Sequence, residues 1–400
     1  MTIIRTALLA LLCLTLALPG AAMAETTLKG GKAEIPALDI ERRPVPDNEA
    51  MRFLQAMGTG WNLGNTFDAT GAVEDEMTLE TYWCGVETTE GMIDLLAKTG
   101  FRTLRLPVSW HDHVSGEDFT ISAAWLDRVQ QVADWALARG MVVILNTHHD
   151  VDPAYYYPDE AHYASSERYI TAIWRQLAER FRDYDEHLIF ESMNEPRLKD
   201  TKHEWWFNQA SAECVEAAEC INRLNQAFVD TVRESGGANA TRYLMVPAYD
   251  ASPDTASGSF FHLPEDKADN RLIVSVHAYT PYNFALDAGG VDQFSVSSTR
   301  STGDIDKFMN ALYNKYIAQG VPVVIGEYGA RLKGMNLQDR VNFAAYYVAS
   351  ATARGIPCCW WDNNAFGGSG ENFGLLRRAK ENWLFPDIVL AILQYAPKAE

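Results

Sequence analysis

The chain has few positive charges for its size. Its 400 residues include 34 Lys and Arg against 53 Asp and Glu, which gives a formal net charge of −19. Proteins that bind nucleic acid or an anionic membrane surface need a basic face. The composition therefore predicts no nucleic-acid partner, and it favours a soluble protein with a neutral or cationic ligand.

Long apolar runs are missing after the N-terminus. Met1–Ala24 has one positive charge, an apolar run at Ala7–Leu18 and the small-x-small sequence Ala22-Met23-Ala24, a pattern typical of a secretory signal. The alternative, a membrane anchor, would need a longer apolar run. We therefore expect a secreted protein, extracellular or periplasmic, with no membrane contact after cleavage near Ala24.

Cysteines are few, and their spacing matches no zinc motif, because Cys-x-x-Cys and Cys/His patterns are absent from the sequence. In an oxidising compartment Cys214 and Cys220 are the expected disulfide pair, since they lie close together in a predicted polar loop. Cys358 and Cys359 are adjacent in a predicted strand and point to opposite faces, so they are expected to be buried apolar residues. Cys84 has no evident partner.

The sequence has no Thr/Pro/Ser-rich linker and no internal repeat, so a second domain is not expected. Residues 25–50 are polar, contain three prolines and lack a clean periodicity, which predicts an N-terminal tail or linker. The remaining residues, 51–400, are then expected to form a single domain.

Short apolar runs in this domain alternate with longer amphipathic segments. The expected strands are Met57–Leu63, Thr103–Val108, Met141–Asn146, Leu188–Met193, Arg242–Pro247, Arg271–Val276, Val321–Gly326 and Ile356–Trp361. They are rich in Val, Ile and Leu without polar alternation, as expected when both faces of a strand are buried. The expected helices are Thr88–Thr99, Ser122–Arg139, Ser165–Asp183, Cys220–Ser235, Ile305–Gln319, Asn336–Arg354 and Asn382–Leu393.

This alternation predicts an α/β fold with a single (β/α)8 TIM barrel. The segment 250–270 is too loop-like for a long helix. The structural alternative is a doubly wound open sheet, which usually carries a Gly-rich phosphate loop. Gly58-x-Gly60 lacks the third glycine and a helix close behind it, so the barrel is favoured.

Polar residues follow the predicted strands at their C-terminal ends, which on a barrel all face one mouth. These residues are Asn62, Asn65, Arg105, His148, His149, Asp150, Asn194, Glu195, His277, Tyr279, Glu327, Trp361 and Asp362.

Glu195 and Glu327 are the most informative pair among them. Two carboxyl groups on opposite sides of a pocket are what glycoside hydrolysis requires. Glu195 is predicted to be the acid/base, with a pKa raised by a dry site. Glu327 is predicted to be the ionised nucleophile.

The neighbouring polar residues are expected to support this pair. Arg105 lies in an apolar strand, where an unpaired guanidinium would be costly, so it must meet a carboxylate; it either holds Glu327 ionised or only closes the barrel. His277 and Tyr279 share one strand face, which places the Tyr279 hydroxyl to orient a carboxylate and His277 to bond the sugar or the acid. Asn194 is suited to bond a sugar hydroxyl beside the reacting carbon.

His148-His149-Asp150 invites a metal-binding interpretation. Adjacent side chains in a strand diverge, however, and the other strand ends lack a matching His or carboxylate pattern, so no metal and no cofactor are expected. His148 is instead predicted to contact the sugar or orient a glutamate. Trp361 is expected to stack on a sugar ring, because sugars have apolar faces.

Seven segments together resemble glycoside hydrolase family 5, a clan A family of retaining (β/α)8 enzymes, and within it the subfamily 4 endo-β-1,4-glucanases, also known as cellulase family A. They are Gly60-Trp-Asn-Leu-Gly-Asn-Thr66, Leu104-Arg-Leu-Pro-Val-Ser-Trp110, Ile144-Leu-Asn-Thr-His-His149, Glu191-Ser-Met-Asn-Glu-Pro-Arg197, His277-Ala-Tyr279, Ile325-Gly-Glu-Tyr-Gly329 and Trp360-Trp-Asp-Asn363.

The resemblance implies a proton donor at Glu195 and a nucleophile at Glu327. It also implies a supporting set and two weaker substrate contacts. The supporting set is Arg105, His148, Asn194, His277, Tyr279 and Trp361, and the weaker contacts are His149 and Asn65.

The expected protein is thus a secreted, monomeric, retaining endo-β-1,4-glucanase that acts on a polysaccharide without a cofactor. The nearest alternatives are hydrolases of xyloglucan, mixed-linkage glucan or mannan. A non-catalytic carbohydrate-binding barrel and a metal-dependent barrel hydrolase are the alternatives of a different class.

Overall fold

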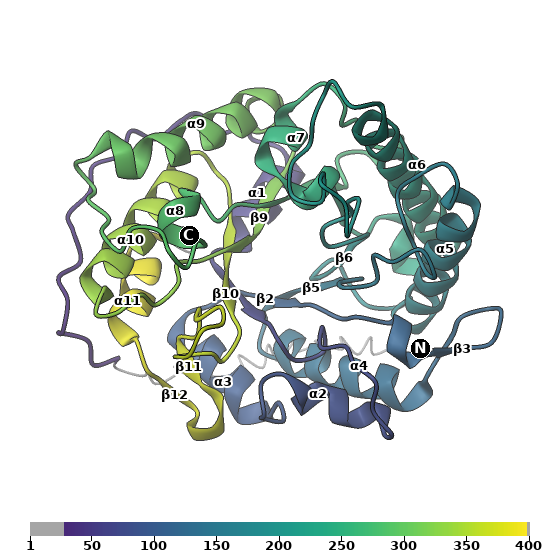
Figure 1. Ribbon diagram of the computed structural model, residues 1–400, viewed down its shortest axis with the longest axis horizontal. Coiled ribbons are helices and arrows are strands. Elements are labelled where there is room, and N and C mark those ends of the chain that lie inside the picture. The colour runs from purple at the N-terminus through teal and green to yellow at the C-terminus, as the bar shows by residue number, and fades with distance from the viewer. Residues whose placement is uncertain (1–27, 398–400) are drawn as a thin grey trace, which may run out of the picture.

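The computed structural model describes residues 28–397 and contains a closed barrel of eight parallel strands (Figure 1). Around the barrel the strands follow the order β1-β10-β9-β8-β7-β6-β5-β2. Their bounds are β1 Gly60–Leu63, β2 Thr103–Leu106, β5 Val142–Asn146, β6 Leu188–Glu191, β7 Leu244–Pro247, β8 Leu272–His277, β9 Val323–Tyr328 and β10 Cys358–Asp362. Each coincides with a predicted strand, so the predicted (β/α)8 barrel is confirmed.

Long helices surround the barrel as an outer ring (Figure 1). They are α3 Glu90–Thr99, α4 Ala123–Leu137, α5 Tyr163–Arg180, α6 Ala212–Glu234, α9 Thr299–Lys315, α10 Leu337–Ala353 and α11 Pro386–Tyr395. Helix α3 shows how the sequence sets such boundaries: the Thr89 side chain accepts a hydrogen bond from the Met92 amide, and Gly100 ends the helix at φ 116°.

Shorter elements precede β1 or lie in the connections. They are α1 Glu49–Ala56, α2 Leu79–Tyr82, α7 Pro253–Ser257, α8 Tyr282–Ala285, and the two-stranded pairs β3 Val114–Ser115 with β4 Thr120–Ile121, and β11 Leu376–Arg377 with β12 Asn382–Trp383. The connection from β7 to β8 holds a 3-10 turn at Tyr249–Ala251 and the five-residue α7, and no long helix, as its loop-like composition predicts. None of the helices in residues 28–397 is long and apolar enough to cross a membrane.

The N-terminal segment lies along the outside of the barrel, where its purple trace passes α9, α10 and α11 in Figure 1. The Gly31 amide donates to Asp387 Oδ1, and the Tyr395 hydroxyl donates to the Pro36 carbonyl. Helix α1 begins directly after this segment. The predicted signal at residues 1–24 lies outside the described residues.

The register of β9 changes next to the mouth of the barrel. Val276 pairs with Ile325, but the next residue, His277, pairs with Glu327, so Gly326 is an extra residue on β9. A Cβ on Gly326 would lie 3.1 Å from His277 Nε2 and 3.3 Å from Arg105 Nε. A bulge at a glycine therefore aims Glu327 into the mouth and leaves room for its neighbours.

The predicted disulfide between Cys214 and Cys220 is wrong. Both residues are buried and free, and both lie in α6, which begins at Ala212 rather than at Cys220. Six residues of helix rise by about 9 Å. A disulfide needs Cα atoms less than about 7 Å apart. The polar side chains that suggested a loop instead cover the solvent face of an amphipathic helix.

This correction predicts a thiol count. Expressed without residues 1–24 and unfolded in denaturant, the protein should react with a thiol reagent at all five cysteines: Cys84, Cys214, Cys220, Cys358 and Cys359. A reductant should leave the midpoint of thermal unfolding unchanged, because no disulfide contributes to stability. A count of three, restored to five by reduction, would contradict the structure.

Candidate active site

Glu195 and Glu327 meet at the C-terminal mouth of the barrel. Glu327 belongs to β9, and Glu195 follows β6. One oxygen of each carboxyl group and one nitrogen of His277 all lie within 4.8 Å of one another. Carboxyl groups about 5–5.5 Å apart are typical of retaining glycosidases, whereas inverting enzymes need about 6.5–9.5 Å for a water molecule. The spacing therefore favours retention.

Arg105 is the centre of the site and is fully buried. Its Nη1 donates to Glu327 Oε1 at 2.7 Å and to Asn62 Oδ1 at 3.0 Å. Its Nε donates to Glu191 Oε2 at 2.8 Å, and its Nη2 donates to Asn194 Oδ1 at 2.7 Å. The expected contact with Glu327 is present, and the same guanidinium orients the Asn194 amide so that its NH2 group is left for another partner.

Glu191 is a site residue that the sequence reasoning missed. It is fully buried, and besides Arg105 it accepts hydrogen bonds from the Ser275 hydroxyl at 2.6 Å and from Asn146 Nδ2 at 3.1 Å. The sequence could have indicated Glu191, since burying an unpaired charged residue at the end of an apolar strand is as costly as burying an unpaired Arg105. Glu191 is thus the second partner that a fully buried guanidinium requires.

Tyr279 holds the second oxygen of Glu327. Its hydroxyl donates to Glu327 Oε2 at 2.9 Å. Burial, and then the charge of Glu327, raise the pKa of Tyr279 well above its ordinary value, so the phenol remains a donor. Arg105 and Tyr279 therefore fix the orientation of the Glu327 carboxylate from both of its oxygens.

His277 bonds the predicted acid, Glu195. His277 Nδ1 lies 2.8 Å from Glu195 Oε1 and 3.7 Å from Glu327 Oε1. Burial raises the pKa of Glu195, but the hydrogen bond with His277 and the charges of His277, Arg197 and His149 lower it to about 2. The predicted upward shift of this pKa is therefore wrong for the ligand-free site, because the sequence did not reveal that cationic neighbours surround the carboxyl group.

Arg197 is the second residue that the sequence reasoning missed. It ends the same segment that carries Glu195, and its Nη1 donates to the Glu195 carbonyl at 2.9 Å. The same nitrogen lies 3.9 Å from Glu195 Oε2. Arg197 therefore holds the backbone that presents the acid and adds positive charge beside it.

His148 and Trp361 form one wall of the site. Their rings stack at 5.7 Å with an interplanar angle of 4°, and His148 Nε2 lies 4.0 Å from Glu327 Oε1. Burial lowers the pKa of His148 well below its ordinary value, so the ring is neutral. Gly64 packs against the Trp361 ring, where a Cβ would approach to 2.7 Å. Both predicted residues thus reach the mouth beside Glu327.

His149 and Asn65 lie farther out. His149 has about a third of its side chain exposed (36%), and its ring lies 5.6 Å from that of Trp83. Burial lowers the pKa of His149 to about 4. Asn65 is half-buried at φ 55°, and its amide donates to Asp68 Oδ2. Their roles as substrate contacts stay predictions.

Two groups of side chains in residues 28–397 have the spacing of metal ligands: Asp68 with His148 and His149, and Glu195 with His277 and Glu327. Both oxygens of Asp68 already accept backbone N–H groups, and both oxygens of Glu327 accept donors from Arg105 and Tyr279. The Arg105 guanidinium is held against the Glu327 carboxylate and neutralises its charge. This arrangement suits a carboxylate that acts as an anion better than one that binds a metal ion. These donor sets therefore do not fit a catalytic metal.

Known proteins are similar to this chain in sequence and in fold. Residues 67–367 match the protein-family model of cellulase, glycosyl hydrolase family 5. Endoglucanase 1 of Ruminococcus albus is 43% identical over 351 residues, 87% of this chain and 82% of that protein. A GH5 family lichenase from Caldicellulosiruptor sp. F32 is 55% identical with a TM-score of 0.90, covering 91% of this chain and 100% of that chain. A GH5-4 broad specificity endoglucanase from Ruminococcus champanellensis is 42% identical with a TM-score of 0.81, covering 88% and 100%.

The buried ion pair predicts the behaviour of Glu191→Gln. Removing one charge of a buried pair costs about 3–5 kcal/mol, so the free energy of unfolding, measured with urea, should fall by about this amount. Glu186→Gln is the matched control, because the Glu186 side chain is half-exposed (47%) and pairs with an exposed member contribute about 1 kcal/mol or less. Equal losses in the two variants would contradict the role given to Glu191.

The contacts of Glu195 predict a pKa change in His277→Ala. The substitution removes a cause that lowers the pKa of Glu195 and keeps burial, which raises it, so the midpoint should move up from about 2 towards or above the ordinary value of 4.5. Carboxyl ¹³C NMR across pH would measure this, with the signal assigned by Glu195→Gln. An unchanged midpoint would show that His277 does not control the charge of Glu195.

Proposed function

This chain belongs to glycoside hydrolase family 5, and on that premise we propose that it cleaves internal β-1,4-glucosidic bonds of glucans with retention of configuration. The observation that carries the proposal is the pair of carboxyl groups, Glu195 and Glu327, with oxygens within 4.8 Å of each other. The reaction needs two carboxyl groups and water, so no cofactor enters the proposal.

In the first step Glu327 attacks the anomeric carbon and forms an ester bond to it. The bond between that carbon and the glycosidic oxygen breaks, and Glu195 gives its proton to this oxygen, so the leaving chain departs as an alcohol. In the second step Glu195 takes a proton from water, the water oxygen bonds to the anomeric carbon, and the ester to Glu327 breaks. Two inversions give net retention.

His277 is the hydrogen-bond partner of the acid in this proposal. The ligand-free site keeps Glu195 ionised, so a proton must reach this carboxyl group before the first step. His277 Nδ1 lies 2.8 Å from Glu195 Oε1, within direct transfer distance. A sugar ring over the site excludes water and favours the neutral form of Glu195.

The substrate proposal rests on the relatives. One of the structural relatives is named a broad specificity endoglucanase, which supports a β-1,4-glucan such as cellulose. Mixed-linkage glucan is the second candidate, because the relative that is 55% identical is named a lichenase. The aromatic wall of His148 and Trp361 suits the glucose backbone that both polymers share.

Export of the protein is proposed from residues 1–24. Their charged start, short apolar run and Ala22-Met23-Ala24 sequence are typical of a cleaved signal. Protein recovered outside the cytoplasm after expression of the full sequence should begin at Glu25 on N-terminal sequencing. Retention of the intact N-terminus in the membrane fraction would favour an anchor.

The activity is tested with two variants and one control. Glu327→Gln should lower kcat on barley mixed-linkage glucan by at least about 10⁴-fold, because it removes the nucleophile. Glu195→Gln should lower it by about 10²–10⁴-fold, since it removes general acid–base catalysis. Glu234→Gln, an exposed residue at the last turn of α6, should keep full activity.

Measurements on the same substrates determine the linkage that is cleaved and the stereochemistry of the product. Carboxymethyl-cellulose and mixed-linkage glucan should lose viscosity faster than reducing ends appear, and ¹H NMR should detect the β-anomer first. Xyloglucan and glucomannan complete the panel. Activity on glucomannan alone, or first release of the α-anomer, would refute the proposal.

A further inference from the structure

Arg197 has two acidic neighbours, and only one of them belongs to the catalytic pair. Its Nε donates to Glu204 Oε1 at 3.3 Å, whereas its Nη1 lies 3.9 Å from Glu195 Oε2, too far for a hydrogen bond. Nη1 donates instead to the Glu195 carbonyl at 2.9 Å. The catalytic acid therefore has a guanidinium beside it that holds its backbone and does not bond its carboxyl group.

This separation needs a cause, because the three side chains lie where solvent screens charge only weakly. The side chains of Arg197, Glu195 and Glu204 are 9%, 16% and 21% exposed. A guanidinium this buried is stabilised by any carboxylate within reach. A movement of about 1 Å would bring Nη1 within hydrogen-bond distance of Glu195 Oε2. That contact would stabilise the ionised acid, whereas the first step of the proposed reaction needs the protonated acid.

Glu204 is held by its own loop and holds Arg197 in turn. Its Oε2 accepts the Asp200 amide at 3.1 Å, and its backbone amide donates to the Thr201 carbonyl at 3.2 Å. The ring of Trp205, the next residue, has its centre 4.1 Å from the Arg197 guanidinium carbon. A cation over an aromatic face adds a second attraction from the same loop. Glu204 and Trp205 thus act together on one guanidinium.

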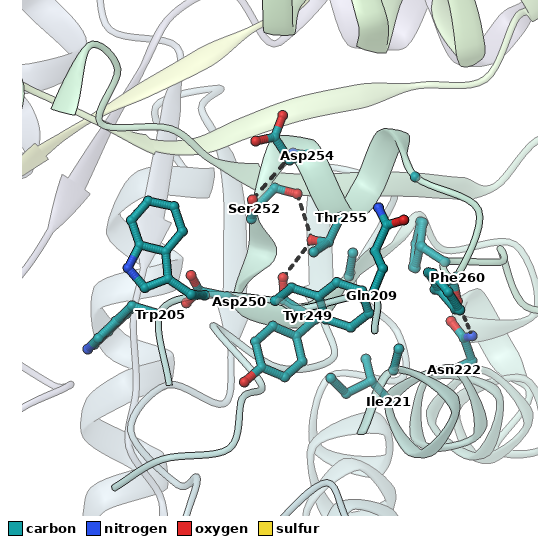
Figure 2. Close-up of a pocket in the computed structure, with 16 residues that line it drawn as sticks. Trp205, Gln209, Ile221, Asn222, Tyr249, Asp250, Ser252, Asp254, Thr255 and Phe260 are labelled. Carbon is teal, nitrogen blue, oxygen red and sulfur yellow. Dashed lines mark hydrogen bonds between the residues drawn. The ribbon is translucent and has the colours of Figure 1, made fainter. Parts of the chain in front are cut away.

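The loop that carries Glu204 is tied to the loop after β7. The Tyr249 hydroxyl accepts a hydrogen bond from the Leu198 amide at 3.1 Å and donates to the His203 carbonyl at 2.6 Å. The two loops together line a cavity of about 480 Å³, with Trp205 and Tyr249 among its lining residues (Figure 2). Glu204 therefore stands on a fixed support and does not need to move towards its partner.

The other charged and titratable groups around the acid come from five further places in the barrel. They are His149 after β5, Asp250 after β7, His277 on β8, Glu327 on β9 and Glu371 after β10. His277 bonds Glu195 Oε1, and Arg197 is the cation that faces Oε2. Burial raises the pKa of Glu195, and His277 and then Arg197 lower it. The position of Arg197 is therefore one of the settings of the acid.

We propose that Glu204 is a positioning residue, which holds Arg197 on the carbonyl of Glu195 and away from its carboxyl group. This role rests on the proposed glucanase activity and adds to it a residue that acts through another and takes no part in bond breaking. Without Glu204, the guanidinium turns to Glu195 Oε2 and keeps the acid ionised.

A crystal structure of the Glu204→Ala variant tests the contact directly. Arg197 Nη1 should move from 3.9 Å to about 3 Å from Glu195 Oε2, because the competing carboxylate is gone. Glu213→Ala is the matched control. Glu213 is another acid beside this loop, 3.8 Å from His203 and with its side chain 69% exposed, and its loss should leave Arg197 in place.

The pH dependence of kcat on cellopentaose measures the consequence. Its basic limb reports the acid in the enzyme–substrate complex. Glu204→Ala should move this limb down by about one pH unit, because a bonded cation stabilises the ionised form of Glu195. Glu204→Gln should move it in the same direction by less, since the amide oxygen still accepts from Arg197. Glu213→Ala should not move it.

The Arg197→Gln variant separates positioning from a direct effect of the Glu204 charge. It removes a cation beside the acid, so the basic limb should move up. In this background Glu204→Ala should cause no further shift, because the residue through which it acts is absent. Thermal unfolding of each variant reports whether the loop is intact, and Glu204→Gln replaces Glu204→Ala in every comparison if the alanine variant does not fold.

A downward shift that requires Arg197 supports the role of Glu204. An Arg197 that stays 3.9 Å from Glu195 Oε2, an unchanged basic limb, or an equal shift in the Arg197→Gln background would overturn it. If the wild-type protein does not hydrolyse cellopentaose, the proposed function fails, and the crystal structure of the Glu204→Ala variant still decides what holds Arg197.

Discussion

The buried Arg105 guanidinium is the interaction on which the rest of this site depends. A cation inside a barrel costs several kcal/mol unless carboxylates and further hydrogen bonds surround it. Glu191 and Glu327 supply the charges, and Asn62 and Asn194 supply neutral acceptors. These partners come from β1, β6, β9 and the turn after β6, so satisfying one side chain fixes how these strands meet at the mouth. The geometry that a retaining mechanism needs follows from this electrostatic requirement.

The two glutamates differ because their partners differ. Glu327 receives a permanent cation and a phenol, which hold both of its oxygens in place. Glu195 receives the His277 imidazole at one oxygen and has the Arg197 guanidinium nearby. Burial raises the pKa of Glu195, but these neighbours lower it to about 2 in the ligand-free site. Glu195 is therefore the carboxyl group whose charge depends on what surrounds it, as suits a residue that must be an acid in one step and a base in the next.

Much of this arrangement could be predicted from the sequence, for reasons that particular residues make clear. Parallel strands buried on both faces produce apolar runs, and the polar residues at their ends converge only if the barrel closes. The family match confirms the resemblance to family 5, and the relatives named GH5-4 confirm its subfamily. The charge state of Glu195 could not be predicted because it depends first on His277, which follows another strand and is near only in space. The helical position of Cys214 could not be predicted, because a polar stretch is equally consistent with a loop and with the solvent face of a helix. Glu191 could have been predicted, because a charged residue at the end of an apolar strand needs a partner, as Arg105 does.

The difference between residues held by the barrel strands and residues held by the loops explains why substrate choice is the hardest property to predict. Arg105, Glu191 and Glu327 are held by strands, where Gly326 is an extra residue and any side chain there would crowd His277. Trp205 and Asp250 are held by loops, through Arg197 and a single backbone hydrogen bond. A change in a strand residue disturbs the buried charges and therefore the whole site, whereas a change in an exposed loop residue such as Trp205 leaves those charges in place. The reaction is thus tied to the stability of the barrel, while the preference for one glucan over another is free to vary at little cost to the fold.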